Sequence, residues 1–472
     1  MSTSFDLMIR NADIATASDR FKCDIGIRHG KIAALGLELG EAAETIDASG
    51  LLVLPGGIDA HCHLDQPMPH GLRMADDFAS GTRSAACGGT TTVIPFAAQT
   101  KGRSLQAAVD DYHNRATGKA AIDYAFHLIV TDPTPEVLQN ELPRLIQKGY
   151  TSFKIYMTYD DLKLNDHEIL KVLDVARTHD ALVMIHAENS DCITWLTERL
   201  ASQGHTAPKF HAVSRPMAVE REATHRAITF SELAGVPILI VHVSGREAIE
   251  QIRWAHGRGL RIYAETCPQY LFLTEQDLDA DGYQGAKCIC SPPPRDKQNQ
   301  EAVWNGLAHN VFSIFSSDHA AFRYDDPQGK KFEGKEQAFQ YIPNGIPGLE
   351  TRLPLLFSGG VTTGRIDIHQ FVALTATNPA KMYGLYPRKG SIMVGADADI
   401  ALWDTQRRVL IDNKMLHHNV DYTPYQGLEV QGWPVLTLSH GKVVSREFSF
   451  VGKSGDGKFL SCGKPMIGRY YL

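Results

Sequence analysis

Two histidines one residue apart end an apolar run early in the chain. The stretch GGIDAHCHLDQP, residues 56–67, follows LLVLP and is typical of a buried strand. Side chains in a strand alternate faces, so His61 and His63 are predicted to point the same way. Such a pair could bind a metal ion, or it could simply be two polar residues at a strand end. The rest of the chain decides between these interpretations.

Four more residues with reactive side chains lie in or after other apolar runs. Lys154 lies within TSFKIYM, where a buried ammonium is costly unless something compensates it. His186 ends ALVMIH, His242 ends PILIVH, and Asp318 follows VFSIFSS. Each has a structural alternative: a histidine satisfied in the core, a lysine that extends to solvent, or an aspartate that caps a helix.

The elements that position these residues are predicted to be the strands of a barrel. Strand-like runs alternate with helical patterns from residue 56 onward: TTTVIPFA, IDYAFHLIV, TSFKIYM, ALVMIHAE, PILIVHV, RIYAETC and VFSIFSSD. With the strand that ends at His61 they make eight, the number in a (β/α)₈ TIM barrel, whose active sites lie at the carboxyl ends of its strands. The six residues are therefore expected to converge. Other histidines, among them His127, His211 and His319, show no such placement and are predicted to be structural.

The two ends of the chain carry a different pattern, the short alternation of a β domain. We predict an α/β chain with a small β-sandwich in two parts, residues 1–55 and 385–472, around a metal-dependent hydrolase barrel in residues 56–384. The last part includes a C-terminal tail, GKPMIGRYYL, that is a candidate subunit contact.

Composition narrows the class of protein. The 472 residues carry a formal net charge of −7 with no basic cluster, so nucleic acid is not an expected partner. No run approaches the ~18–20 apolar residues of a membrane span, and the N-terminus lacks a signal-peptide pattern, so we expect a cytoplasmic enzyme without a membrane partner. The eight dispersed cysteines are expected to be reduced. Cys288 and Cys290 form a C-x-C in a strand-like run, where a core role is favoured over metal binding.

Four imidazoles and a carboxylate suit zinc or a similar divalent ion, and they are too many for one tetrahedral centre. Two ions about 3.5–4 Å apart would accommodate them. Lys154 would repel both ions as an ammonium. Reaction with CO₂ would turn it into a carbamate, a bidentate anion that can bridge them.

The set H-x-H, K, H, H and D, together with the return strand GADADIALWD, resembles the amidohydrolase superfamily. Finer motifs resemble its dihydropyrimidinase and D-hydantoinase branch: GGIDAHCHLD, ADDFASGT, GGTTTVIPF, SFKIYM, HAEN, ETCPQYL, SPPPRDKQNQ, IPNG and EVQGWP. They extend from Gly56 to Pro434 and so cover most of the chain.

The resemblance implies a binuclear metal centre with a carboxylated lysine. Carried over, Lys154 is an N6-carboxylysine that bridges two zinc ions. His61, His63 and Asp318 hold the more buried ion, and the other is held by His186 and His242.

The resemblance also implies a reaction and its substrate contacts. Tyr159 polarises the substrate carbonyl, Ser291 and Asn344 contact the substrate, and Asp318 transfers a proton to the ring nitrogen that leaves. The substrate is then a cyclic ureide or imide, the product an N-carbamoyl amino acid, and the assembly a homotetramer or homodimer. An allantoinase, a dihydroorotase, a cyclic imidase, phosphotriesterase-like chemistry and a non-catalytic scaffold relative are the alternatives.

Two positions depart from the patterns of relatives. Lys163 stands in a loop where hydantoinases tend to have an aromatic residue, so the pocket for a ring substituent is not defined by the resemblance. Asp65 stands where dihydroorotases have an arginine that holds the substrate carboxylate. An aspartate there either repels a carboxylate or orients a metal-binding histidine, and in both cases neutral rings are the expected substrates.

Overall fold

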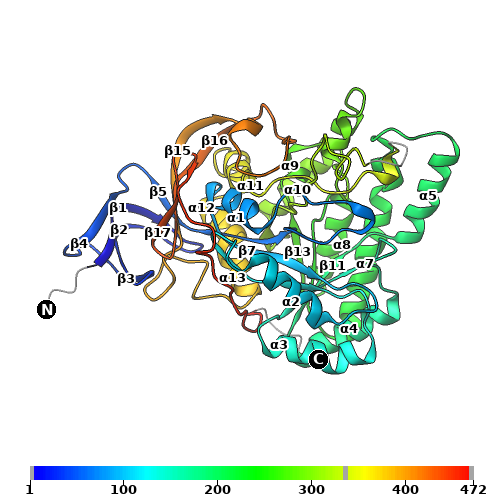
Figure 1. Cartoon of the computed structure of the whole chain (residues 1–472), viewed down its shortest axis with the longest axis horizontal. Coiled ribbons are helices and arrows are strands. Elements are labelled where there is room, and N and C mark those ends of the chain that lie inside the picture. Colours follow the sequence, from blue (N-terminus) through cyan, green and yellow to red (C-terminus); the bar gives the residue numbers. More distant parts are fainter. Residues whose placement is uncertain (1–4, 333–337, 467–472) are drawn as a thin grey trace.

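Strands from both ends of the chain pair in one mixed sheet beside the barrel (Figure 1). The computed structural model describes residues 5–332 and 338–466. The order of the sheet is β18-β17-β16-β15-β5-β1-β2-β3, with β4 paired to β1. Its strands are β1 (Phe5–Ala15), β2 (Arg20–Arg28), β3 (Lys31–Gly36), β4 (Ala42–Asp47), β5 (Leu52–Pro55), β15 (Ile400–Leu410), β16 (Glu429–Ser439), β17 (Lys442–Arg446) and β18 (Ser449–Phe450). The β domain expected from both ends is thus confirmed.

The middle of the chain forms the expected parallel barrel, with strand order β14-β13-β12-β11-β10-β9-β7-β6. The strands are β6 (Gly57–Cys62), β7 (Thr90–Ala98), β8 (Asp123–Tyr124), β9 (His127–Ile129), β10 (Ser152–Tyr156), β11 (Leu182–His186), β12 (Ile238–Ile240), β13 (Ile262–Thr266) and β14 (Ile314–Phe315). The segment after β14 closes the ring: Asp318 N–H donates to His61 O at 2.9 Å, and His63 N–H donates to His319 O at 2.6 Å.

Helices surround the barrel, as Figure 1 shows. They are α1 (Phe78–Cys87), α2 (Leu105–Ala116), α3 (Leu142–Gln147), α4 (Asp166–His179), α5 (Ser190–Ser202), α6 (Phe210–Ser214), α7 (Met217–Ala234), α8 (Arg246–Gly257), α9 (Gln269–Phe272), α10 (Lys297–Ala308), α11 (Arg352–Leu356), α12 (Ile368–Val372) and α13 (Asn378–Met382). Asn189 caps α5 by accepting from Cys192 N–H, so this helix begins directly after the HAEN motif at the rim. None of the helices in the described ranges is long and apolar enough to cross a membrane.

The structure differs from the sequence prediction in detail. The predicted strand at 122–130 is divided into β8 and β9, and the strand before Asp318 shortens to two residues. The KCIC run, residues 287–290, starts in the 3₁₀ helix Gln284–Cys288 and forms no strand. It lies in a separate apolar cluster, where apolarity reflects burial and not strand pairing.

The chain beyond β18 returns to the barrel instead of staying with the small sheet. Leu460 N–H donates to Tyr124 O at 2.7 Å, and Cys462 N–H donates to Gly149 O at 3.0 Å. Most of the predicted contact tail, residues 467–472, lies outside the described residues.

Candidate metal and substrate site

His61, Lys154 and Asp318 meet at the carboxyl rim of the barrel. His61 Nε2 lies 2.7 Å from Lys154 Nζ and 3.2 Å from Asp318 Oδ1. Lys154 is 1% exposed, and its ammonium otherwise faces the rings of Phe96 and Tyr156. The lysine therefore does not extend to solvent, and no helix begins between residues 319 and 332 for Asp318 to cap.

His61 and His63 point to the same side, as the strand period predicts. His63 Nε2 lies 3.6 Å from Asp318 Oδ1, and the two imidazole centroids are 5.5 Å apart. Ligand atoms of His61, His63 and Asp318 all lie within 4.8 Å of one another. Three such atoms at this separation can surround a single cation.

His186 and His242 form a second pair beside this group. Their ring centroids are 4.5 Å apart, and the His242 ring is 5.4 Å from that of His61. The Nδ1 atom of His242 is buried and has no hydrogen-bond partner among the described residues. An unsatisfied buried nitrogen among imidazoles is the arrangement expected where a metal ion supplies the missing partner.

Carboxylates and an amide hold the imidazoles by one nitrogen and leave the other toward the centre. Glu265 Oε1 lies 2.6 Å from His61 Nδ1, and it also accepts the backbone N–H of His242 at 3.1 Å. Gln66 Oε1 lies 2.6 Å from His63 Nδ1. Such contacts orient metal-binding histidines and select their tautomer. The sequence motifs did not indicate that Glu265 and Gln66 orient the histidines.

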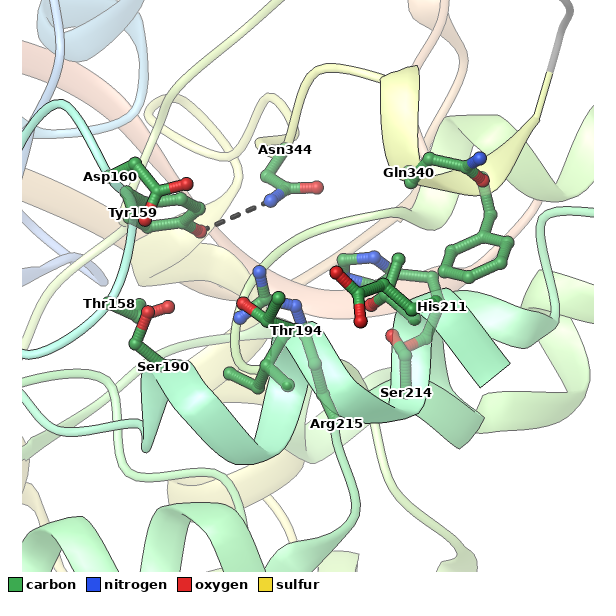
Figure 2. A pocket seen from close by; sticks show the side chains of 14 residues that line it. Thr158, Tyr159, Asp160, Ser190, Thr194, His211, Ser214, Arg215, Gln340 and Asn344 are labelled. Atoms are coloured by element: carbon green, nitrogen blue, oxygen red, sulfur yellow. Dashed lines mark hydrogen bonds between the residues drawn. The ribbon is translucent and has the colours of Figure 1, made fainter. Parts of the chain in front are cut away.

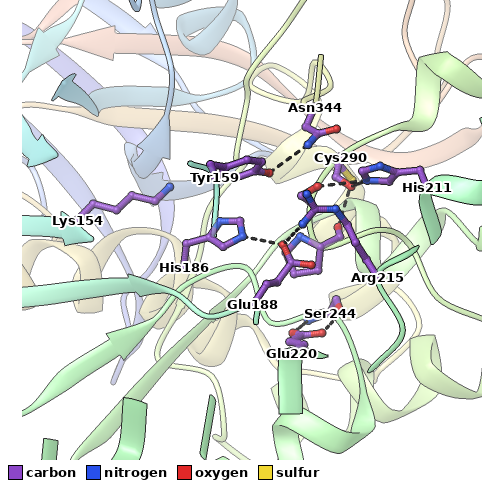
Figure 3. A network of polar contacts seen from close by, with 12 residues as sticks. Lys154, Tyr159, His186, Glu188, His211, Arg215, Glu220, Ser244, Cys290 and Asn344 are labelled. Atoms are coloured by element: carbon purple, nitrogen blue, oxygen red, sulfur yellow. Dashed lines mark hydrogen bonds and ion pairs between the residues drawn. The ribbon is translucent and has the colours of Figure 1, made fainter. Parts of the chain in front are cut away.

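Glu188 holds His186 in the same way and extends the network outward (Figure 3). Its Oε2 lies 2.7 Å from His186 Nε2 and accepts from Arg215 at 2.7 Å. Burial opposes ionisation of Glu188, but Arg215 and His186 outweigh it and lower its pKa to about 2. The HAEN motif had signalled this carboxylate without assigning it a role.

Burial governs the ionisation of the rim. It lowers the pKa of His63 to about 4 and that of Lys154 to about 8, and it moves the pKa of His242 well below its usual value. Burial opposes ionisation of Asp318, yet the surrounding histidines outweigh it and hold its pKa well below the usual range. At His61, burial opposes the charged form, but Glu265 and Asp318 outweigh it and raise the pKa. The rim therefore favours neutral imidazoles at His63, His186 and His242 and an ionised carboxylate at Asp318, the protonation states that bind divalent cations.

Three residues predicted to form the site, Tyr159, His242 and Asp318, have left-handed backbone conformations. The φ angles are 69° at Tyr159, 38° at His242 and 48° at Asp318. Such conformations are uncommon outside glycine, and they concentrate at functional sites where the surroundings enforce them.

Tyr159 lies beside His186, whereas Asn344 contacts Tyr159 and Ser291 contacts His211. The Tyr159 hydroxyl accepts from Asn344 Nδ2 at 3.1 Å, and its ring centroid is 5.4 Å from that of His186. Ser291 Oγ lies 3.2 Å from Nε2 of His211. The placement of His211 is thus corrected: it borders the site, and only its tertiary contacts show this.

A second buried lysine supports this side of the site. Lys330 donates to Ile289 O at 3.0 Å and to Pro343 O at 2.7 Å, so it ties together the loops that carry Ser291 and Asn344. Lys330 stands in a charged stretch of the sequence, and nothing in that stretch indicates this role.

The other histidines and the cysteine pair have structural partners. His127 contacts Ser152 Oγ and Ala60 O, and His319 contacts Asp76 at 3.1 Å next to the closure of the barrel. Cys288 and Cys290 are buried thiols in an apolar cluster and belong to none of the candidate metal groups found among the described residues.

Asp65 and Lys163, the two residues that depart from the patterns of relatives, have partners outside the group of predicted metal ligands. Asp65 accepts from Arg115 at 3.0 Å, so the suggested orientation of a histidine by Asp65 is wrong: Gln66 takes that contact. Lys163 contacts Asp160 at 2.6 Å and Ser190 at 3.1 Å, at the edge of a cavity next to Tyr159.

This cavity opens next to the rim (Figure 2). Its volume is about 290 Å³, close to the lower end for small-ligand pockets. Tyr159, Asn344, His211 and Arg215 line it together with one face of α5. Two of the three predicted substrate contacts, Tyr159 and Asn344, thus line an open space next to His186, whereas Ser291 is not among its lining residues.

Known proteins resemble the chain over nearly its whole length. Residues 52–444 match the model of the amidohydrolase family. A D-hydantoinase of Ralstonia pickettii is 45% identical over 96% of this chain and 98% of its own, and a D-phenylhydantoinase of Escherichia coli is 38% identical over 98% and 99%. The crystal structure of a dihydropyrimidinase from Brevibacillus agri superposes with a TM-score of 0.94 at 42% identity, over 97% and 98% of the two chains.

The match covers the barrel, the small sheet and the rim alike. Each predicted metal ligand and substrate contact thus lies within the aligned span, in a barrel of the same architecture. On sequence, fold and family model together, the chain belongs to the amidohydrolase family, in its D-hydantoinase and dihydropyrimidinase branch.

Proposed function

We propose that this protein is a metal-dependent hydrolase that opens the ring amide of a hydantoin or a dihydropyrimidine and releases an N-carbamoyl amino acid. The observation that carries the proposal is the convergence of four imidazoles, a carboxylate and a buried lysine at the carboxyl rim of a parallel barrel. Relatives named D-hydantoinase and dihydropyrimidinase support a cyclic ureide as the substrate class.

Two divalent ions would fit the donor set. His61, His63 and Asp318 would hold one, and His186 with His242 the other. The ring nitrogen that each orienting group leaves unused and the unpartnered Nδ1 of His242 support this assignment. When bound, such ions lower the pKa of a water and polarise a carbonyl. Zinc is proposed because nitrogen and carboxylate oxygen are ligands that it accepts readily.

Lys154 is proposed to carry a carbamate shared between the two sites. Its ammonium has no carboxylate at ion-pair distance among the described residues and contacts an imidazole instead. Burial lowers its pKa to about 8, so the neutral amine that reacts with CO₂ is accessible near neutral pH. Carboxylation would replace an uncompensated buried cation by an anion among cations.

Asp318 would transfer the proton, and Tyr159 would stabilise the oxyanion. As the new C–O bond forms at the ring carbonyl, Asp318 accepts the proton of the attacking water and delivers it to the ring nitrogen whose C–N bond breaks. Burial raises the pKa of Tyr159, so its hydroxyl stays protonated and can donate to the oxygen that gains charge. Ser291 and Asn344 would hold the polar edge of the ring.

A turnover panel tests the proposal. The metal-loaded protein should open dihydrouracil or hydantoin in preference to allantoin, succinimide and dihydroorotate, because no arginine stands at position 65 to hold a carboxylate. Elemental analysis should find about two divalent ions per chain, and chelation should abolish ring opening. A preference for dihydroorotate, or activity without metal, would contradict the assignment.

The proposal extends to assembly and location. We propose a homotetramer or homodimer in the cytoplasm, where free thiols persist, and all eight cysteines are free. Light scattering of the purified protein and cell fractionation check the two statements.

A further inference from the structure

The cavity beside Tyr159 extends away from the predicted metal ligands along α5. One face of this helix lines it, through Ser190, Ile193, Thr194, Thr197 and Glu198. These positions recur at the spacing of one helical face. A ring bound beside Tyr159 and Asn344 would thus direct a substituent along this face.

That helical face is mostly polar. Ile193 is the only aliphatic side chain among its five lining residues, and Gln340 and Asp160 add further polar groups to the lining (Figure 2). A substituent placed here would leave hydroxyls and carboxylates without water unless it offered them hydrogen bonds. The wall therefore suits a polar substituent better than a purely apolar one.

The charges around the cavity do not cancel. Arg215 is paired with Glu188 at 2.7 Å, and Asp160 with Lys163 at 2.6 Å. Glu198 is exposed and has neither an ion pair nor a hydrogen bond with other described residues. It lies about 12 Å along the helix axis from Ser190, the residue that Lys163 contacts. One negative charge is thus left uncompensated at the outer end of the cavity.

We propose that Glu198 makes this site select ring substrates whose substituent ends in a cationic or hydrogen-bond-donating group, such as an aminoalkyl chain. The inference rests on the proposed ring-opening function and specifies its substrate class. Glu198 acts on the substituent by attraction across the cavity, whereas the ring amide stays with the groups at the rim. A positive substituent gains this attraction, and a negative one is repelled.

An isosteric pair of substrates isolates the charge. Hydantoins with a 4-aminobutyl or a pentyl substituent at C5 have chains of equal length and differ in one ammonium. At low ionic strength the ratio of their kcat/KM values should favour the aminobutyl ring by about two- to fivefold, the size expected of an exposed ion pair, and added salt should reduce it. A 3-carboxypropyl hydantoin should be the poorest of the three.

Variants then assign the preference to one residue. Glu198→Gln should abolish the ratio, and Glu198→Lys should invert it in favour of the carboxypropyl ring. Glu250→Gln on α8 is the matched control, an exposed glutamate away from the cavity, and should keep the wild-type ratio. The ratio of the two kcat/KM values is taken within each variant, so a substitution that changes both rates equally leaves the ratio unchanged.

The outcomes separate the two proposals. An unchanged ratio in Glu198→Gln, or no preference in the wild type while hydantoin and its pentyl derivative are opened, overturns the role of Glu198 and leaves the ring-opening function standing. Failure to open any ring, unsubstituted hydantoin included, overturns the proposed function and this inference with it.

Discussion

At the scale of single residues, two buried lysines show how surroundings decide chemistry. Lys330 is fully buried, which lowers its pKa to about 7, and its amino group donates to two backbone carbonyls. Lys154 is equally buried but contacts an imidazole, and imidazoles compete with it for protons. The first arrangement is structural, whereas the second is stable only if the charge of the lysine changes or is offset.

Replacement of Lys154 by alanine should remove the anion that we propose to join the two metal positions. We expect most of the metal to be lost and turnover to fall by about three orders of magnitude, since metal-ion catalysis supplies several kcal/mol. Short carboxylic acids such as propionate should restore part of both by filling the space. Metal analysis and hydantoin turnover measure this, and full metal content with unchanged turnover would rule out the bridging role.

Asp318→Asn separates ligation from proton transfer. The amide oxygen can still contact a metal ion, but the side chain cannot accept a proton. Turnover should fall by roughly two to four orders of magnitude while metal content is largely retained. Near-wild-type rates would remove Asp318 from the mechanism, and loss of metal would assign it to ligation alone.

At the scale of elements, the site depends on loops that the barrel strands do not hold directly. The loops with Ser291 and Asn344 approach each other where Gly345 N–H donates to Ile289 O at 3.0 Å, and Lys330 adds two further hydrogen bonds. A charged donor buried between two loops restricts both, because its removal leaves carbonyl groups without a partner.

Lys330→Met should therefore loosen the substrate side of the site without affecting the metal side. We expect KM to rise by about tenfold with a smaller change in kcat, the pattern of lost substrate binding, and with metal content unchanged. Lys331→Met is the matched control, since this half-buried neighbour contacts Asp325 and the Tyr324 ring instead of the two loop carbonyls. Equal effects of the two substitutions would refute the positioning role.

At the scale of the molecule, a buried ion network joins the barrel to the sheet of the chain ends. Lys389 is 2% exposed and contacts Asp123 of β8 at 2.6 Å as well as Asp397 and Asp399, which precede β15. His440 contacts Asp123 at 2.7 Å from the turn after β16. We propose that the two-part β domain and the barrel unfold together because this network lies between them.

Lys389→Met should destabilise the protein by about 3–5 kcal/mol, because three buried carboxylates would lose their common partner. Lys31→Met should cost about 1 kcal/mol or less, since Lys31 also pairs with Asp397 but is half exposed. Thermal and urea denaturation compare the two. A similar small loss in both variants would contradict the importance of the network.

The pH dependence of this stabilisation follows from the pKa directions. Burial opposes ionisation of Asp123, but His440 and Lys389 outweigh it and lower its pKa from the usual 3.8. Burial opposes the charged form of Lys389, but Asp399, Asp123 and Asp397 outweigh it and raise its pKa above the usual 10.5. The stabilisation is therefore present above about pH 4 and is lost in acid, and at the alkaline end it declines only above pH 10.5. Denaturation curves of Lys389→Met and wild type should converge in acid.

The sequence by itself determined the barrel, the β domain from both chain ends and the six rim residues, because these follow from local patterns. Strand period, the alternation of strands and helices, and the rule that barrel sites lie at strand ends need only neighbouring residues. Gln66 and Glu188 lie within three residues of the histidines that they hold, whereas the orienting group Glu265, the loop tie through Lys330 and the cavity charge of Glu198 depend on the tertiary structure. Glu265 lies 204 positions from the histidine that it holds. No local pattern links residues so distant, since only the closed barrel brings them within hydrogen-bond distance.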